Sequence, residues 1–134
     1  MMDRQSRIAA SFLSLIVLAG CGTSGPQIAP VSGHITLDGR PLATADIVFQ
    51  PEDGQRPSMG RCDAEGRYVL SYKRGQEGAL VGKHVVQISV SREIVKNAPT
   101  IAAKFNTQSE VRREVKPGLN EFDFDVTTEK AEKK

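Results

Sequence analysis

Residues 31–49 read VSGHITLDGRPLATADIVF, and two short alternating runs in this stretch decide the fold. Every second residue of the first run is apolar or glycine, and the run ends at Asp38-Gly39, a dipeptide typical of hairpin turns. The second run alternates in the same way and stops at Pro51. The inward positions are Val31, Gly33, Ile35 and Leu37, then Ala45, Ile47 and Phe49. The stretch therefore predicts two antiparallel strands that each bury one face.

The rest of the chain repeats this pattern of short alternating runs between turn residues. Further strands are predicted at 59–63, 68–72, 81–91, 111–115 and 122–126, with tight turns at 63–66 and 117–118. Residues 92–109 are the least regular part and the longest candidate binding loop, and no segment shows a convincing helical period. About seven short strands with turns between them predict an all-β fold, a single antiparallel Ig-like sandwich.

The N-terminus has the composition of an export signal. Arg4 and Arg7 form a basic start, residues 8–18 form an apolar run, and the small residues Ala19 and Gly20 follow it. The apolar run is shorter than the roughly 20 residues that a membrane-spanning helix requires. A signal peptide is therefore favoured over the alternatives, a short transmembrane anchor or a buried helix.

Leu18-Ala19-Gly20-Cys21, directly behind this run, resembles a bacterial lipobox. The resemblance implies that residues 1–20 are a cleaved lipoprotein signal peptide and that Cys21 carries acyl chains such as palmitate. Each buried methylene contributes about 0.8 kcal/mol, so more than one chain is needed for a stable anchor. In proteins with such a lipobox, Asp after the cysteine is associated with retention in the inner membrane. The residue here is Gly22, so the resemblance implies the outer membrane, with the domain on its periplasmic face.

Polar segments flank the predicted sandwich. Residues 21–30 are rich in Gly, Ser and Pro and predict a flexible tether. Residues 127–134, TTEKAEKK, predict a charged, disordered tail. The sandwich itself is predicted over residues 31–126, which is long enough to bury one core.

The composition argues against a nucleic-acid partner. The formal net charge is +2, aromatic residues make up 5% of the chain, and Trp is absent. Nucleic-acid-binding domains typically combine a basic stripe or patch with aromatic side chains on which bases stack.

Three segments together resemble the carboxypeptidase regulatory-like domains, which have a transthyretin-like sandwich. Residues 31–49 are similar to the first two strands of that family, CDAEGRY at 62–68 to its turn T-D-x-x-G-x-[YF], and GKHVVQI at 82–88 to the following strand. Cys62 stands where Thr is usual in the family. The resemblance implies that residues 31–126 form a non-catalytic module, similar to those of small bacterial lipoproteins with one such domain.

Two histidines and the second cysteine are the candidates for site chemistry. His34 falls on the outward phase of its strand, whereas His84 shares the phase of Val86 and is expected at the rim of the core. Cys62 is interpreted as a small, partly buried side chain, with a reactive exported thiol as the alternative. Copper or zinc could bind this donor set, but nothing in the spacing of the three residues supports such a site.

The last predicted strand places acidic residues outward. Glu121, Asp123 and Asp125 alternate with apolar residues, so they are interpreted as a solvated face and not as a catalytic pair. We expect cross-strand pairing of this acidic row with the basic residues of the preceding run, Arg112, Arg113 and Lys116.

Together with the sequence patterns, these resemblances imply a lipid-anchored, non-catalytic module of the cell envelope, without a metal or cofactor. Its partners would be the membrane, through the lipid on Cys21, and an unknown envelope protein or polysaccharide; a structural role is also open. The alternative is an exported metal- or small-molecule-binding protein that uses His34, His84 or Cys62.

Overall fold

The structure is a computed structural model that describes residues 26–129. The predicted signal peptide, Cys21 and residues 130–134 lie outside the described residues. Within residues 26–129 no helix has the length and apolar character needed to cross a bilayer. Among these described residues, a short 3-10 helix, η1 (Ala103–Phe105), accompanies the strands. The strands are β1 (Ile28–Ala29), β2 (Val31–Leu37), β3 (Arg40–Pro41), β4 (Ala45–Pro51), β5 (Ser58–Arg61), β6 (Arg67–Val69), β7 (Ser71–Lys73), β8 (Gln76–Glu77), β9 (Ala79–Leu80), β10 (Gly82–Val90), β11 (Arg112–Val115), β12 (Asn120–Glu121) and β13 (Phe124–Val126).

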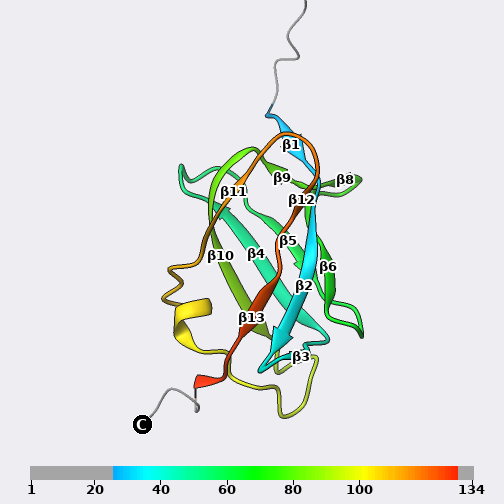
Figure 1. The fold of residues 1–134 in the computed structure, drawn as a ribbon, viewed down its shortest axis with the longest axis vertical. Coiled ribbons are helices and arrows are strands. Elements are labelled where there is room, and N and C mark those ends of the chain that lie inside the picture. Colours follow the sequence, from blue (N-terminus) through cyan, green and yellow to red (C-terminus); the bar gives the residue numbers. More distant parts are fainter. Residues whose placement is uncertain (1–25, 130–134) are drawn as a thin grey trace, which may run out of the picture.

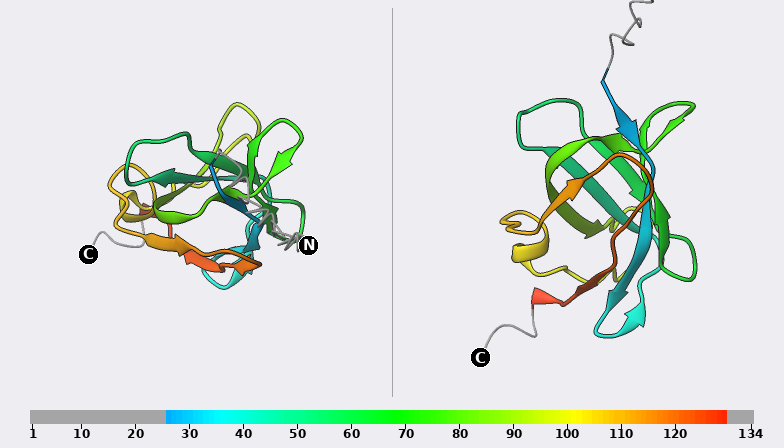
Figure 2. Two further views of the ribbon diagram at one scale, coloured as in Figure 1. Left: turned by 90° about the horizontal axis from the view of Figure 1, so that it is seen from above. Right: turned by 45° about the horizontal axis from the view of Figure 1, so that its top comes forward.

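Two sheets pack against each other (Figures 1 and 2), and the predicted all-β sandwich is confirmed. The larger sheet has the order β11-β10-β4-β5-β7-β8. In the second sheet β2 is central, with β12 and β13 along one side and β3 and β6 along the other. A separate pair, β1 and β9, lies where the described chain enters the fold.

The stretch at residues 31–49 folds largely as predicted. Val31 and Ile35 of β2 are buried, and the outward side chains between them are exposed. Asp38 and Gly39 both have positive φ, 52° and 82°, as a two-residue hairpin of type I′ requires, and the chain returns as β3. Pro51 does not stop β4 but is its last residue, so this boundary is one residue later than expected.

The first and last strands of the sandwich run parallel, which corrects the expectation of a purely antiparallel fold. Glu121 of β12 lies opposite Ser32, and Asp125 of β13 lies opposite Thr36. Parallel neighbours need a long connection between them, and here the whole larger sheet lies between β2 and β12 in the chain. A period-two pattern shows which face of a strand is buried but carries no information on the direction of its neighbour.

Tyr68 and Tyr72, predicted on one strand, belong to different sheets. β6 pairs with β2, β7 pairs with β5, and the chain crosses from one sheet to the other at the buried Leu70. The backbone N–H of Leu70 donates to the Val31 carbonyl at 2.9 Å, and its carbonyl accepts from Gly78 at 2.7 Å. The backbone therefore stays hydrogen-bonded while the strand changes sheet.

The ordered fold is longer at both ends than the predicted range 31–126. β1 lies within the predicted tether, yet it pairs with β9 and buries Ala29. Thr128 lies within the predicted tail, yet it forms a β-bridge with Ile101. Residues 26–30 and 127–129 are therefore hydrogen-bonded parts of the domain.

The segment 92–109 packs against the sandwich and is not a free loop. Ala98, Ile101 and Ala102 are buried, and η1 follows them. The hydroxyl of Ser109 donates to the carbonyl of Val86 on β10. This segment therefore forms part of the core boundary, which its irregular sequence did not indicate.

The core lies between the sheets and contains a group of aromatic rings. The ring centroid of the fully buried Phe49 lies 5.9 Å from that of Phe122 and 6.3 Å from that of Phe124. Tyr68 lies 6.4 Å from Phe124. Aromatic pairs of this kind contribute about 0.5–1.5 kcal/mol each beyond the area that they bury. The rings therefore join both sheets into one core.

Candidate functional site

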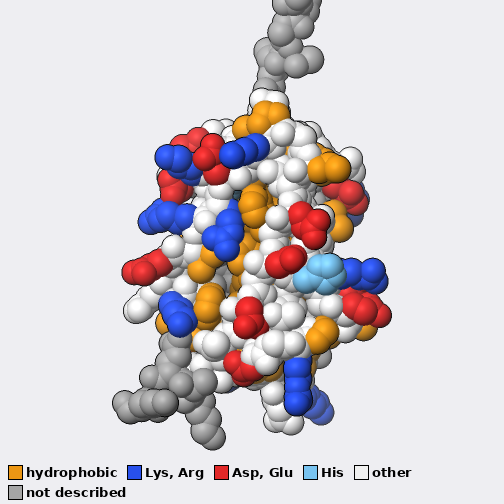
Figure 3. Space-filling model, in the orientation of Figure 1, with side chains coloured by type: hydrophobic (Ala, Val, Ile, Leu, Met, Phe, Trp, Pro, Cys, Tyr) orange, Lys and Arg blue, Asp and Glu red, His pale blue; other side chains and the backbone are white. Residues whose placement is uncertain are grey.

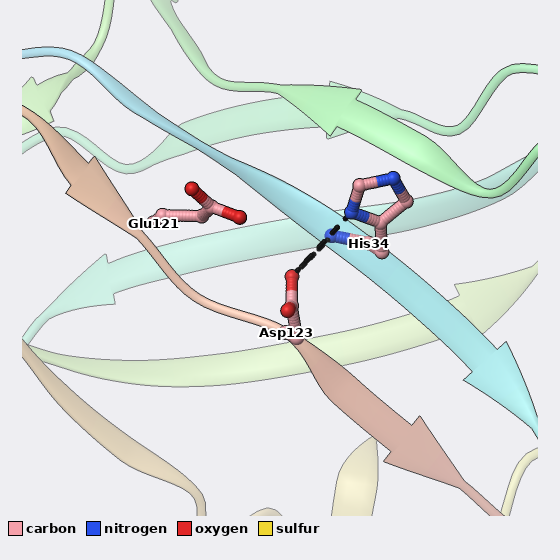
Figure 4. A group of neighbouring side chains, drawn as sticks. All are labelled: His34, Glu121 and Asp123. Atoms are coloured by element: carbon pink, nitrogen blue, oxygen red, sulfur yellow. Dashed lines mark hydrogen bonds and ion pairs between the residues drawn. The ribbon is translucent and has the colours of Figure 1, made fainter.

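The parallel pairing of β2 with β12 and β13 brings His34 beside two carboxylates. His34 lies on the outward side of β2, Glu121 on β12, and Asp123 in the link before β13. Figure 4 shows the three side chains together, and one ligating atom from each lies within 4.8 Å of the others. All three residues are exposed.

Asp123 ties this cluster to the backbone of β2. Its Oδ1 accepts a hydrogen bond from the backbone N–H of His34 at 2.9 Å and lies 3.6 Å from Nδ1 of the same residue. The two side chains are 50% and 64% exposed. An ion pair with protonated His34 therefore contributes at most about 1 kcal/mol, and it is the backbone hydrogen bond that positions the carboxylate.

The break between β12 and β13 sets the positions of Glu121 and Asp123. Phe122, the residue between them, donates its backbone N–H to the Ser32 carbonyl at 2.9 Å. Its carbonyl accepts the hydroxyl of Tyr68 at 2.6 Å and lies directly over Gly33. The chain can approach β2 this closely because residue 33 has no side chain.

We call the outer surface of the second sheet the β2 face. Its central column consists of Ser32, His34 and Thr36 of β2. On one side of β2 lies the acidic column, Glu121, Asp123 and Asp125, and on the other side lie Arg67 and Val69 of β6. A depression of about 280 Å³ lies between β2, β6 and β12. Figure 3 shows a histidine side chain on this surface with acidic and basic side chains around it.

Asp125, the third member of the acidic column, has a structural role. Its Oδ1 accepts hydrogen bonds from Thr36 Oγ1 at 2.7 Å and from the backbone N–H of Gly39 at 3.1 Å. These two bonds lower the pKa of the Asp125 carboxyl. Asp125 therefore holds the β2–β3 hairpin to β13, and the groups open to a ligand are those of His34, Glu121 and Asp123.

An imidazole and two carboxylates can act in two ways. They are donor types that bind divalent cations such as Zn²⁺, for which imidazole is a common ligand. They also accept hydrogen bonds from hydroxyl or amine groups of a protein or polymer. Both uses are open at this position because the cluster faces solvent.

The predicted combination of His34 with His84 and Cys62 does not form. His84 is only 1% exposed, so the expectation of a rim position is wrong. Its Nε2 lies 2.7 Å from the Leu80 carbonyl, and its ring packs 5.6 Å from that of Phe49. Within residues 26–129 the cluster of metal-binding side chains comprises His34 with the two carboxylates, and neither His84 nor Cys62 belongs to it.

Cys62 is a small side chain at a strand end, as predicted, but it is more deeply buried than expected. It follows β5, is 5% exposed, and donates its backbone N–H to the Ala45 carbonyl at 2.8 Å. Burial raises the pKa of the thiol to about 11. Because the thiolate is the reactive form, this environment protects Cys62 from oxidation and alkylation.

The expected pairing of the acidic column with Arg112, Arg113 and Lys116 is not found within residues 26–129. β11 belongs to the larger sheet, where it pairs with β10. Arg112 forms an ion pair with Glu52 instead. The guanidinium of Arg113 lies 4.9 Å from the ring centroid of Phe124.

Glu121 and Asp123 are the site residues whose proximity to His34 the sequence did not indicate. Their outward phase is as predicted, but the sequence associates them only with a solvated face. The sequence feature that could have indicated the cluster is that His34, Glu121 and Asp123 were all predicted to point outward from their strands. Nothing local indicated that the two segments are neighbours, because they are almost ninety residues apart in the chain.

The fold and the cluster define an all-β sandwich with an exposed imidazole–carboxylate site. No family model matches the sequence, and no curated protein is significantly similar to it. Among solved structures, the fold is similar to that of a DUF3823 family protein from Parabacteroides merdae, with a TM-score of 0.48 at 12% sequence identity. The match covers 78% of this chain and 48% of that one, so this chain spans about half the length of that protein.

Proposed function

We propose that this protein is a lipid-anchored, non-catalytic β-sandwich of the cell envelope that binds an envelope protein or a surface polymer. The observation that carries the proposal is Leu18-Ala19-Gly20-Cys21, directly behind a basic start and an apolar run. The resemblance of residues 31–49, 62–68 and 82–88 to carboxypeptidase regulatory-like domains supports a non-catalytic role.

The β2 face is the surface that we propose for partner binding. It combines the polar groups of His34, Glu121 and Asp123 with the apolar side chain of Val69, which is 52% exposed. A depression of about 280 Å³ lies among these elements. Mixed polar and apolar surfaces of this kind are typical of non-obligate protein interfaces.

The anchor is tested on the full chain in a bacterium with two membranes. Mass spectrometry of the purified protein is expected to show loss of residues 1–20 and acyl chains on Cys21, and membrane fractionation is expected to find the protein in the outer membrane. Cys21→Ser should release the protein from the membrane, whereas the matched control Cys62→Ser should not. An intact Met1 or an unmodified Cys21 would overturn the proposal.

Partner binding is tested by site-specific photo-cross-linking in intact cells. A cross-linker at Ser32, on the β2 face, is compared with one at Gln87, which is exposed on the outer face of the larger sheet. We expect a discrete adduct from position 32 that is lost in the variant His34→Ala/Glu121→Gln. An adduct from position 87 alone would move the interface to the other sheet, and no adduct from either position would contradict a binding role.

A second candidate function is divalent-cation binding, and the proximity of the His34, Glu121 and Asp123 ligand atoms favours it. Titration with Co²⁺ or Zn²⁺, followed by the NMR signals of the histidine rings, should perturb His34 and leave the buried His84 unchanged. His34→Ala should abolish the effect and Glu77→Gln, on the β8 hairpin, should not. Equal broadening of both histidines or of neither would exclude the site.

A further inference from the structure

One end of the sandwich lies where the chain arrives from Cys21, and we call it the tether end. β1 enters there and pairs with β9. β4, β7 and β11 all run toward this end, so the loops 52–57, 74–75 and 116–119 are grouped around β1. Asn120 joins the last of these loops to the entry point, since its backbone N–H donates to the Pro30 carbonyl at 3.0 Å.

The covalent distance from Cys21 to this end is short. Only residues 22–25 separate an acylated Cys21 from Pro26, the first described residue. An extended residue spans at most about 3.6 Å, so Pro26 lies within about 18 Å of the lipid-bearing residue. The tether end is therefore confined near the lipid headgroups, whatever path the intervening residues take.

The side chains at the tether end fit an anionic lipid surface. Leu119 is 92% exposed at the tip of its loop. The three loops and β7 also carry four exposed cationic side chains: Arg56, Lys73, Arg74 and Lys116. Of these, Arg56 also donates its Nε–H to the Tyr72 carbonyl at 2.9 Å. The carboxylates at this end are Asp53 and Glu52 on loop 52–57 and Glu77 on β8, and Glu52 forms an ion pair with Arg112. Cationic side chains beside an exposed Leu are the combination that anchors proteins at a headgroup interface.

We propose that the tether end is a second membrane contact, in which Leu119 enters the headgroup region and Arg56, Lys73, Arg74 and Lys116 contact anionic lipid. The inference rests on the proposed lipid anchor. In such a contact the tether end of the sandwich faces the membrane. The β2 face, on the side of the sandwich, then stays exposed to water. The domain then has a fixed orientation on the membrane and is not freely swivelling on its tether.

The test uses the protein purified after expression of the full chain in a bacterium with two membranes and then mixed with vesicles of phosphatidylethanolamine and phosphatidylglycerol. An environment-sensitive fluorophore is attached at Leu119→Cys and, as a matched control, at Ala43→Cys, which is exposed at the far end of the sandwich. Cys62 is buried and should stay unlabelled, which mass spectrometry verifies. We expect a blue shift and quenching by brominated lipid at position 119 and neither at position 43.

Two further variants test the role of the cationic side chains at the tether end. Lys73→Gln/Arg74→Gln/Lys116→Gln should reduce the quenching at position 119 several-fold, whereas Arg40→Gln/Arg92→Gln/Lys96→Gln should not. Replacing phosphatidylglycerol by phosphatidylcholine should have the same effect as the first triple variant. Equal reductions by both triple variants, or no effect of either, would overturn the role of the tether-end cations.

Failure of this inference and failure of the anchor give different results. Vesicle flotation reports the anchor directly. If the chain floats with the vesicles but the probe at position 119 stays in water, or if both probes respond equally, the tether-end contact is overturned and the anchor stands. If the chain does not float and Cys21 is unmodified, the proposed function itself is wrong, and the tether-end contact with it.

Discussion

The backbone carbonyl oxygen of Phe122 occupies the place where a side chain of residue 33 would begin. A Cβ atom built on Gly33 would lie 1.9 Å from this oxygen and 3.0 Å from the hydroxyl of Tyr68. Gly33 is an inward position of β2, between Val31 and Ile35, and its missing side chain is what lets the last strands pair with β2. The relationship therefore connects the opening stretch of the sequence to the positions of Glu121 and Asp123.

Gly33→Ala is expected to destabilise the domain by about 1–3 kcal/mol or more, because the clash is with backbone and cannot be relieved by a side-chain rotation. Urea denaturation measures the change in the free energy of unfolding. Ser32→Ala, at an exposed position on the same strand, is the control and should change it little. Equal stability of Gly33→Ala and Ser32→Ala would show that Phe122 does not need this space.

Tyr68→Phe tests the hydrogen bond that completes this arrangement. The hydroxyl of Tyr68 donates to the Phe122 carbonyl at 2.6 Å, and its loss should cost about 0.5–1.5 kcal/mol. Burial raises the pKa of Tyr68 well above its ordinary value. The contribution of the neutral, buried Tyr68 to the free energy of unfolding is therefore present below the unfolded-state pKa of about 10 and is lost as the pH rises above it. Alkaline destabilisation should therefore be weaker in Tyr68→Phe than in the wild type, whereas the control Tyr72→Phe should behave like the wild type.

Cys62 should react slowly in the folded protein. The residue is 5% exposed and burial raises the pKa of its thiol to about 11, so little thiolate is present near neutral pH. Alkylation by iodoacetamide at pH 8, followed by mass spectrometry, is expected to be at least tenfold slower in buffer than in urea. Because the folded pKa lies above the unfolded value of about 8.5, Cys62 also contributes to the loss of stability between about pH 9 and 11. Equal alkylation rates in buffer and in urea would contradict the buried position.

Asp125→Asn should destabilise the β2–β3 hairpin. Hydrogen bonds from Thr36 and Gly39 lower the pKa of Asp125, so its contribution is present above the unfolded value of about 3.9 and is lost as the pH falls through the folded value. Thermal unfolding between pH 2 and 6 should show a smaller acid-induced decrease in Tm for Asp125→Asn than for the wild type. Glu110→Gln, an exposed carboxylate outside this network, is the control. If Tm falls as much on acidification in Asp125→Asn as in the wild type, these hydrogen bonds add no stability.

The inward side of most strands was predictable from the chain alone. Val31, Ile35, Ile47 and Phe49 are buried as their alternation indicates, because a half-buried strand must place apolar side chains on every second residue. The Asp38-Gly39 turn followed from the same reasoning, since both of its residues need positive φ. These are local requirements, and they are written within a few neighbouring residues.

Strand breaks and strand partners were not predictable in this way. Tyr68 and Tyr72 keep one alternating pattern although the chain changes sheets between them at Leu70. His84 shares the phase of core residues, but its complete burial depends on Phe49 and Leu80, which other parts of the chain place around it. Burial of a polar ring is decided by these neighbours and not by its own strand.

The sequence by itself therefore determined the all-β class, the faces of its main strands and the hairpin at Asp38-Gly39, because alternation and turn chemistry act over a few residues. Only the tertiary structure decided that the last strands run parallel to β2 and that Glu121 and Asp123 meet His34. That meeting depends on the close approach of Phe122 to Gly33, a contact between segments almost ninety residues apart. No local pattern encodes such a contact, since it forms only when both sheets close on their common core.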